Sequence, residues 1–197
     1  MEQSTKDRIL DEALVLFAEK GYKGTNLREL AARLSLSKSA LYKHYDSKEA
    51  IWNALLDKME AYYAARFGSM DHLPKMPDST EEFFQMALGM IRFTAHDPQI
   101  ILTRKLLLTE QFHDARVCKL ATKHFLEGTA HIYTKVFESM MEKGLLKKED
   151  PAMLAFSFTA PISAFIHLCD REPGRTTEAF DKMEIYIRYF LTSHAPQ

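Results

Sequence analysis

The chain has 197 residues, of which 46% are hydrophobic, so it is long enough to bury a substantial core. Its formal net charge of −1 gives no overall attraction to a polyanionic partner. The two cysteines, Cys118 and Cys169, fit no metal or redox pattern and are interpreted as reduced structural thiols. We find no signal peptide and no uninterrupted apolar span of membrane length, which predicts a soluble cytoplasmic protein without a membrane partner.

The first predicted element is an amphipathic helix over residues 6–20, which ends before Gly21. Its buried side carries Ile9, Ala13, Leu14, Phe17 and Ala18. This helix is the expected scaffold for the helices that follow.

A second short helix begins near Leu27, because apolar residues recur there at spacings of three and four. They are Leu27, Leu30, Ala31 and Leu34. Asn26 and Glu29 have the spacing of a capping box at its start. The segment Ser35 to Ser37 then turns the chain, and Ser37 is the right residue type to cap a third helix over residues 38–45.

In this third helix Leu41 and Tyr45 are predicted to face the core. The other faces carry Lys38, Ser39, Tyr42 and Lys43, which are free to contact a partner. Two short helices around a tight turn, followed by a long helix, form the layout of a DNA-reading helix-turn-helix.

The segment from Gly21 to Trp52 resembles the N-terminal signature of TetR-family transcriptional regulators. The matching positions are Gly21, Tyr22, Thr25, Leu30, Ala31, Ser37, Lys38, Leu41, Tyr42, Tyr45, Ser47, Lys48 and Glu49. Two positions depart from the family pattern, because Ser35 stands where the turn normally has Gly and Ser39 stands where a small residue is common. The resemblance implies an all-α protein with an N-terminal three-helix helix-turn-helix domain and a C-terminal helical ligand-binding and dimerisation domain.

The local charge supports a DNA partner, because the stretch from Lys20 to Lys48 has a charge of +5. Its cations are Lys20, Lys23, Arg28, Arg33, Lys38, Lys43 and Lys48, against Glu29 and Asp46. A charge run alone is more often a solvated surface, but here it coincides with the motif.

The predicted DNA-binding residues combine residue chemistry with this resemblance. They are Thr25, Asn26, Arg28, Ser37, Lys38, Ser39, Tyr42, Lys43, His44 and Lys48. Thr25 and Lys48 are expected at helix starts, where free N–H groups favour phosphate. Lys38, Ser39 and Lys43 are candidates for base edges or adjacent phosphates. The resemblance places Tyr42 against the DNA backbone, whereas His44 is either a phosphate contact or a bystander.

The predicted domains are residues 1–48, with a linking helix over 47–67, and residues 68–197. Residues 68–79 are rich in Gly, Pro, Ser and Asp, which marks the join. Beyond it we predict helices at about 80–96, 98–110, 113–143, 151–170 and 177–193. Pro161 is expected to kink or split the fourth of these helices.

The last two helices carry more large apolar groups than one core stripe needs, so they predict a homodimer that packs as a four-helix bundle. The candidate interface residues are Phe158, Ile162, Phe165, Ile166, Tyr186, Tyr189 and Phe190. An unusually thick monomer core is the alternative.

Met and aromatic residues in the middle helices can line an apolar effector pocket, although most such residues are plain core. The candidates are Met86, Met90, Phe93, Leu107, Gln111, Phe125 and Tyr133. No cofactor and no metal site are expected, since nothing fixes the mutual geometry of the histidines.

The predicted function is therefore a TetR-type transcriptional regulator, a repressor that a small, largely apolar ligand releases from a palindromic double-stranded DNA operator. One alternative is an architectural or protein-interaction module on DNA without an effector. The other is an all-helical enzyme that uses Cys118 or a histidine, which is disfavoured because the sequence contains no catalytic signature.

Overall fold

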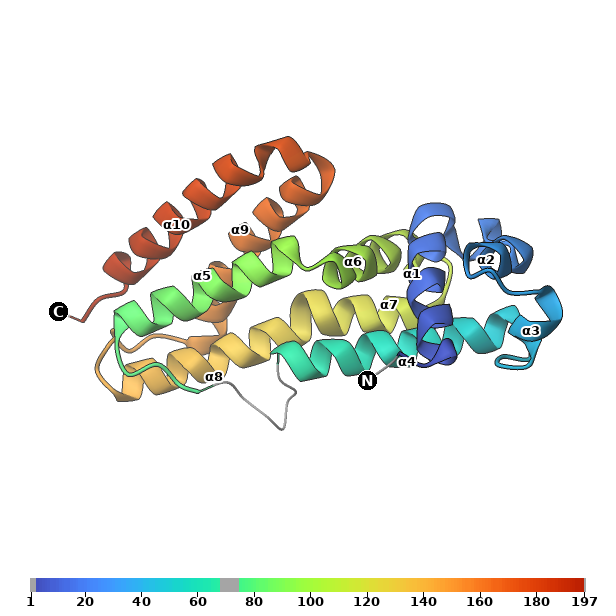
Figure 1. Ribbon diagram of the computed structural model, residues 1–197. Helices are drawn as coiled ribbons and strands as arrows, with labels where there is room; N and C mark the ends of the chain where they lie inside the picture. The colour runs from blue at the N-terminus through green and yellow to red at the C-terminus, as the bar shows by residue number, and fades with distance from the viewer. Residues whose placement is uncertain (1–2, 68–74, 197) are drawn as a thin grey trace. The chain divides into compact units, whose positions relative to one another are not determined.

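The computed structural model describes residues 3–67 and 75–196, and all the regular elements among them are helices (Figure 1). They are α1 (Thr5–Gly24), α2 (Leu27–Arg33), α3 (Lys38–Tyr42), α4 (Lys48–Phe67), α5 (Thr80–His96), α6 (Pro98–Glu110), α7 (Ala115–Thr122), α8 (Gly128–Glu142), α9 (Pro151–Arg171) and α10 (Thr176–Ser193). A π-helix at Lys123–Glu127 joins α7 to α8, and a 3₁₀ turn at Pro173–Arg175 precedes α10. Residues 68–74 of the predicted join lie outside the described residues.

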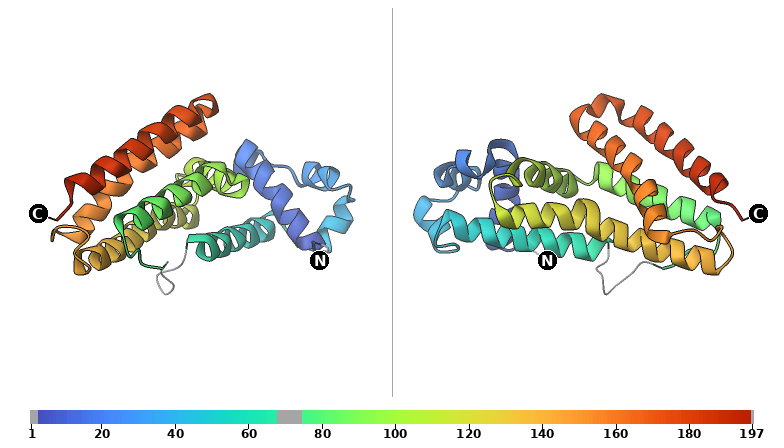
Figure 2. Two further views of the ribbon diagram at one scale, coloured as in Figure 1. Left: turned by 60° about the vertical axis from the view of Figure 1, so that its left-hand side comes forward. Right: turned by 180° about the vertical axis from the view of Figure 1, so that it is seen from behind.

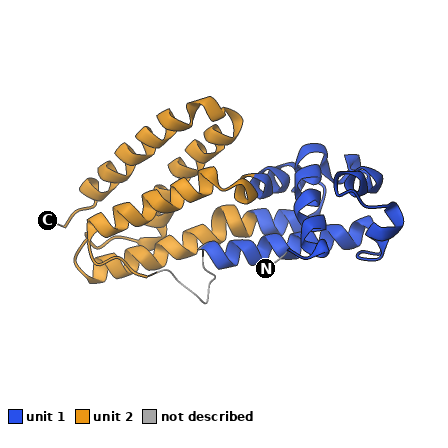
Figure 3. Ribbon diagram, in the orientation of Figure 1, with its two compact units in different colours: residues 1–66, 102–121 blue, residues 67–101, 122–197 orange. Residues whose placement is uncertain are grey.

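The chain divides into two compact units (Figure 3). Unit 1 comprises residues 1–66 and 102–121, and unit 2 comprises residues 67–101 and 122–197. Residues 102–121, which the sequence analysis assigned to the C-terminal domain, therefore pack with the N-terminal helices. The functional division near residue 68 stays a prediction.

Helix α1 is interrupted near its end by Gly21, whose φ of 70° lies in the left-handed region. The helix was predicted to end before Gly21, and the break lies there, although helical turns resume as far as Gly24. The predicted buried side of α1 is confirmed, since Ile9, Ala13 and Phe17 are fully buried. The break turns the chain toward α2.

The turns around α2 and α3 follow from local side-chain capping. Asn26 caps α2 by accepting from the Arg28 N–H at 2.9 Å, while Glu29 pairs with Lys20 instead of completing a capping box. Ser37 caps α3 by accepting from the Ala40 N–H at 3.1 Å, as predicted. Ser35 adopts φ 55°, which explains why the family commonly has Gly at this position.

Helix α3 ends at Tyr42, three residues before the predicted end. The N–H groups of Lys43 and His44 bond the carbonyls of Ala40 and Leu41, three residues back, so the final turn tightens. The chain then bends at Asp46 and Ser47, and the Ser47 hydroxyl caps α4 by accepting from the Ala50 N–H. Leu41 is fully buried and Tyr45 is half-buried.

Unit 2 is built from four long helices, with α9 packed against α5, α8 and α10, and with α10 also against α5 (Figures 1 and 2). Its core centres on aromatic rings from each of these helices, namely Phe83, Tyr133, Phe137, Phe158 and Phe190. The ring centroids of Phe158 lie 4.9 Å from those of both Tyr133 and Phe190. Each helix therefore contributes an apolar stripe to one shared core.

Helix α9 continues through Pro161 and is not split, contrary to one of the two predicted outcomes. Proline has no N–H, so the carbonyl of Ser157, four residues earlier, loses its helical partner. The Tyr186 hydroxyl of α10 donates to this carbonyl at 2.6 Å. This bond satisfies the carbonyl and also ties α10 to α9.

The single helix predicted over 113–143 is divided by the π-helix. Here the Gly128 N–H donates to the carbonyl of Lys123, five residues earlier. A Cβ at Gly128 would lie 2.9 Å from that oxygen, so glycine permits the close approach. Amphipathic periodicity does not distinguish a π turn from an α turn, which is why the sequence analysis missed it.

Helix α9 is long and apolar enough to cross a membrane by length and composition alone, which the sequence analysis did not anticipate. Its residues Leu154, Ala155, Phe158, Ile166 and Cys169 are buried in the core of unit 2. The hydrophobicity of α9 is therefore partly accounted for by its central place in this core.

Candidate nucleic-acid interface

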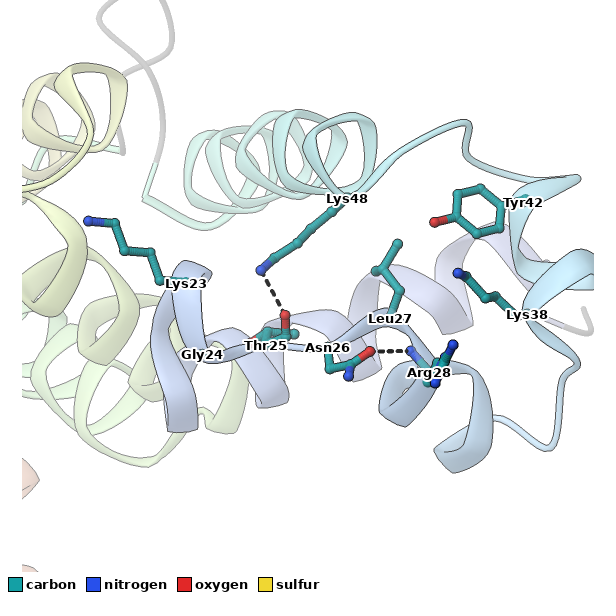
Figure 4. A pocket seen from close by; sticks show the side chains of 9 residues that line it. All are labelled: Lys23, Gly24, Thr25, Asn26, Leu27, Arg28, Lys38, Tyr42 and Lys48. Carbon is teal, nitrogen blue, oxygen red and sulfur yellow. Dashed lines mark hydrogen bonds between the residues drawn. The ribbon is translucent and has the colours of Figure 1, made fainter.

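A groove of about 510 Å³ opens in unit 1 between the end of α1, the start of α2, helix α3 and the start of α4 (Figure 4). It is lined by Lys23, Gly24, Thr25, Asn26, Leu27, Arg28, Lys38, Tyr42 and Lys48. Four cationic side chains and a phenol thus converge around one concavity. Such a lining suits a polyanion whose backbone carries regularly spaced phosphates.

Six of the ten predicted DNA-binding residues line this groove, namely Thr25, Asn26, Arg28, Lys38, Tyr42 and Lys48. Ser37, Ser39, Lys43 and His44 lie outside its lining. Ser39 and Lys43 are exposed on α3 and its last turn, and His44 is half-buried. The Ser37 hydroxyl caps α3 and is also 3.0 Å from the Ser39 hydroxyl.

Thr25 and Lys48 form part of the groove wall. Thr25 is 4% exposed, and its hydroxyl donates to the carbonyl of Gly21 at 2.8 Å. Lys48 donates from Nζ to the Thr25 carbonyl at 2.7 Å, and it lies 4.5 Å from the centre of the Tyr22 ring. Partial burial lowers the pKa of Lys48, and the negative charge of Glu110 opposes this shift. Both side chains therefore support the groove before any ligand binds.

Six of the cations between Lys20 and Lys48 fall into two groups, and Lys48, described above, belongs to neither. Lys20 pairs with Glu29 at 2.6 Å, and Arg33 pairs with Glu12 and Glu19 at 3.0 and 3.1 Å. Among the described residues, no ion pair involves the second group, Lys23, Arg28, Lys38 and Lys43. This second group keeps its charge available for phosphate.

Tyr42 is 38% exposed and lies on α3, with the Lys38 ammonium 5.5 Å from the centre of its ring. Figure 4 shows both side chains facing the start of α2 across the groove. Cation–π attraction to the ring limits the positions of the Lys38 ammonium, so a cation and a phenol lie side by side.

Lys23 and Gly24 line the groove but were not among the predicted site residues. Lys23 was counted in the local charge, and its position two residues before Thr25, the first residue of the predicted set, was the available signal. Gly24 is exposed, so a phosphate can approach its backbone closely.

The wall of the groove rests on an aromatic cluster in unit 1. The Trp52 ring of α4 lies 5.0 Å, centre to centre, from both Phe17 and Tyr22. Its Nε1 donates to the Asp114 carboxylate at 2.9 Å. Burial raises the pKa of Asp114, but bonds from Trp52 and from the N–H groups of Val117 and Arg116, with the Arg116 charge, outweigh it and lower the pKa overall.

Residues 9–55 match the model of a family described as bacterial regulatory proteins, tetR family. This range contains α2, α3 and all the residues that line the groove. Residues 9–55 are thus a TetR-family segment. Its all-helical fold, with an N-terminal helix-turn-helix followed by further helices, agrees with the predicted fold class.

Among curated relatives, the helix-turn-helix negative regulator IcaR of the biofilm operon icaADBC in Staphylococcus epidermidis is 41% identical over 58 residues. The match covers 29% of this chain and 31% of that regulator, so the similarity spans less than a third of the relative. The matching family model and this relative are both described as regulatory proteins, which supports the prediction of a regulator.

Among solved structures, SmeT, the repressor of the Stenotrophomonas maltophilia multidrug efflux pump SmeDEF, has a TM-score of 0.67 at 16% identity. That match covers 98% of this chain and 91% of SmeT. A SmeT–triclosan complex has a TM-score of 0.74 at 18% identity, and the match covers 99% of this chain and 93% of that chain. At this identity the likeness concerns the fold.

The candidate dimer residues differ in burial. Phe158, Ile166 and Phe190 belong to the core of unit 2, and Ile162, Phe165 and Tyr186 pack against it. Of the seven candidates, Tyr189 is the one that is largely exposed, at 68%. The other large exposed apolar side chains on α9 and α10 are Met153, Phe156 and Ile185. Whether each of these residues is buried or exposed depends on the orientation of its helix face, which the sequence alone could not show.

The candidate effector residues are divided between the two units. Leu107 and Gln111 lie in unit 1, where Leu107 is fully buried and Gln111 donates to the Leu108 carbonyl. The other five lie in unit 2. Tyr133 is in its core, with a pKa raised by burial, and the Phe125 ring lies 6.4 Å edge-on from His167. Met86, Met90 and Phe93 are half-buried on α5.

A metal site would require a cluster of acidic, histidine or cysteine side chains. Across residues 3–67 and 75–196, no three such side chains are placed to hold a metal ion.

Proposed function

We propose that this chain binds double-stranded DNA through the groove and helix α3, and that it represses transcription by occupying an operator. The observation that carries this proposal is a groove lined by Lys23, Arg28, Lys38 and Tyr42, whose three cations form no ion pair within the described part of the chain. Phosphate contacts at the groove would set the register, and exposed residues of α3 would read base edges. The supporting relatives include the negative regulator IcaR.

The test is binding of the purified protein to the DNA that flanks its own gene, measured at two salt concentrations. We expect salt-sensitive binding that exceeds binding to a scrambled duplex, and we expect Tyr42→Ala to weaken it while helicity is unchanged. Tyr42 is 38% exposed, so its removal should leave the core intact. Equal affinity for operator and scrambled DNA, at every salt concentration, would contradict a specific regulator.

We further propose that the protein acts as a cytoplasmic homodimer on a palindromic operator. The exposed apolar side chains of α9 and α10, Met153, Phe156, Ile185 and Tyr189, supply a surface for a second copy. Two helix-turn-helix domains separated by about 34–36 Å would meet successive major grooves on one face of the duplex. Symmetry of the protein would then match symmetry of the site.

The proposed effector is a small, largely apolar molecule that binds among the helices of the C-terminal region and releases the operator. A SmeT structure of similar fold holds triclosan, which supports this ligand class. Half-buried Met86, Met90 and Phe93 on α5, together with Phe125, offer adaptable apolar surface. Release requires that the ligand bind the DNA-free conformation more tightly than the DNA-bound one.

Titration of the protein–operator complex with a panel of apolar drugs, lipids and metabolites tests the effector. We expect at least one class to weaken operator binding by tenfold or more, at about 1.4 kcal/mol per tenfold. Met90→Glu should abolish this response while leaving operator affinity unchanged, because α5 is remote in sequence from the groove residues and lies in unit 2. A panel without effect would favour a DNA-binding module that has no effector.

A further inference from the structure

The carboxylate of Glu110, the last residue of α6, lies against the break in α1. Glu110 is 8% exposed, and its Oε1 accepts from the Tyr22 N–H at 3.1 Å. A Cβ on Gly21 would lie 2.5 Å from this oxygen, so any other residue here would force the carboxylate to shift. The left-handed φ of Gly21 and this close approach together explain why the helix breaks at this residue.

A buried carboxylate is costly unless it is hydrogen-bonded and its charge is balanced. The Tyr22 N–H supplies the bond, and Lys48 of α4 supplies an opposite charge that interacts with Glu110. Lys48 in turn donates to the Thr25 carbonyl and lies over the Tyr22 ring. Helices α6, α1 and α4 thus meet around one short segment.

This segment, Tyr22 to Thr25, supplies Lys23, Gly24 and Thr25 to the groove. Glu110 itself is not a lining residue. We propose that Glu110 is a positioning residue for DNA binding, which holds the Tyr22–Thr25 segment in the shape that forms the groove. The inference rests on the proposed DNA-binding function, because it says that a carboxylate on α6 maintains the shape of the groove wall.

The sign of the expected effect separates positioning from simple electrostatics. Removal of a negative charge from a DNA-binding protein should strengthen its attraction to phosphate. A positioning role predicts the opposite, since loss of the bond lowers the fraction of molecules with a binding-competent groove. The two explanations therefore predict opposite changes in DNA affinity.

The experiment compares the full-length wild type with Glu110→Ala, Glu110→Gln and Glu142→Gln on labelled duplexes of the gene's flanking DNA and of scrambled sequence. Glu142→Gln is the matched control, because Glu142 is exposed on α8 in unit 2 and the substitution also removes one negative charge. We expect Glu110→Ala to weaken binding by about five- to tenfold. Glu110→Gln should lose less, because its amide oxygen still accepts from Tyr22. Glu142→Gln should bind as the wild type or slightly tighter.

Exchange of the Tyr22 amide hydrogen, followed by NMR in the same variants, gives a second readout. It should accelerate in Glu110→Ala and remain slow in Glu142→Gln. If Glu110→Ala does not fold, Glu110→Gln decides, with weakened binding at unchanged helicity as the expected result. Wild-type binding with undiminished affinity in the folded Glu110 variants would overturn this inference alone. A wild type that binds neither duplex would overturn the proposed function and this inference with it.

Discussion

Phe158→Ala is expected to lower the free energy of unfolding by about 3–5 kcal/mol, a large part of the stability of an ordinary domain. Phe158 is fully buried in unit 2, and its ring contacts rings from α5, α8 and α10. Alanine would leave a cavity among these rings, and the lost apolar contacts would destabilise the core. Urea unfolding followed by circular dichroism, at a fixed protein concentration, measures the change.

The matched control for this prediction is Phe156→Ala, two residues earlier on the same helix. Phe156 is 53% exposed, so its loss should change the stability of the folded chain by less than about 1 kcal/mol. If α9 forms the proposed dimer surface, the same variant should weaken dimerisation by tenfold or more in sedimentation equilibrium. Dimers of unchanged affinity in Phe156→Ala, Tyr189→Ala and the double variant would place the interface elsewhere.

The double variant Arg28→Ala, Lys38→Ala is expected to weaken DNA binding by about tenfold or more. It should also reduce the slope of log affinity against log salt concentration by about two. Both side chains line the groove, and neither forms an ion pair among the described residues. Each therefore has a charge to contribute to a phosphate. Fluorescence anisotropy over a salt series, with helicity as a check on folding, gives both quantities.

The control for this prediction is Lys20→Ala. This substitution likewise removes a cation, in this case from α1. The Lys20 ammonium lies 2.6 Å from Glu29, so much of its charge is already neutralised within unit 1. We expect its salt slope to stay close to that of the wild type. An equal fall in slope in Lys20→Ala would mean that the net charge of the domain determines binding, and that the groove has no special role.

The sequence alone predicted the elements whose causes are local. The spans of α5 and α6 agree with the prediction, and Ser37 caps α3, because helix periodicity and capping depend on residues within one or two turns. The predictions were wrong where the local signal is weak, or where a residue distant in the chain supplies the missing interaction. Pro161 does not split α9, because Tyr186 on another helix satisfies the carbonyl that proline leaves open.

The candidate site was found from sequence to the extent that its residues are neighbours in the chain. The groove gathers six predicted residues because the family motif encodes the turns between α1 and α4. Two of them, Thr25 and Lys48, also have a structural role, because Thr25 is buried and Lys48 bonds its carbonyl, so both hold the groove wall. Whether a lysine faces solvent or a carbonyl depends on packing that periodicity does not describe.

The amino-acid sequence by itself indicated most of the helices, the caps at Asn26 and Ser37, and the TetR-like segment, since each arises from interactions between residues close in the chain. Tertiary structure decided which aromatic side chains of α9 and α10 are core and which are exposed. It also brought Glu110 to the Tyr22 N–H and Asp114 to Trp52, contacts that join residues 88 and 62 positions apart. Such contacts depend on how whole helices pack, because a buried carboxylate is stable only where the folded chain supplies its partner.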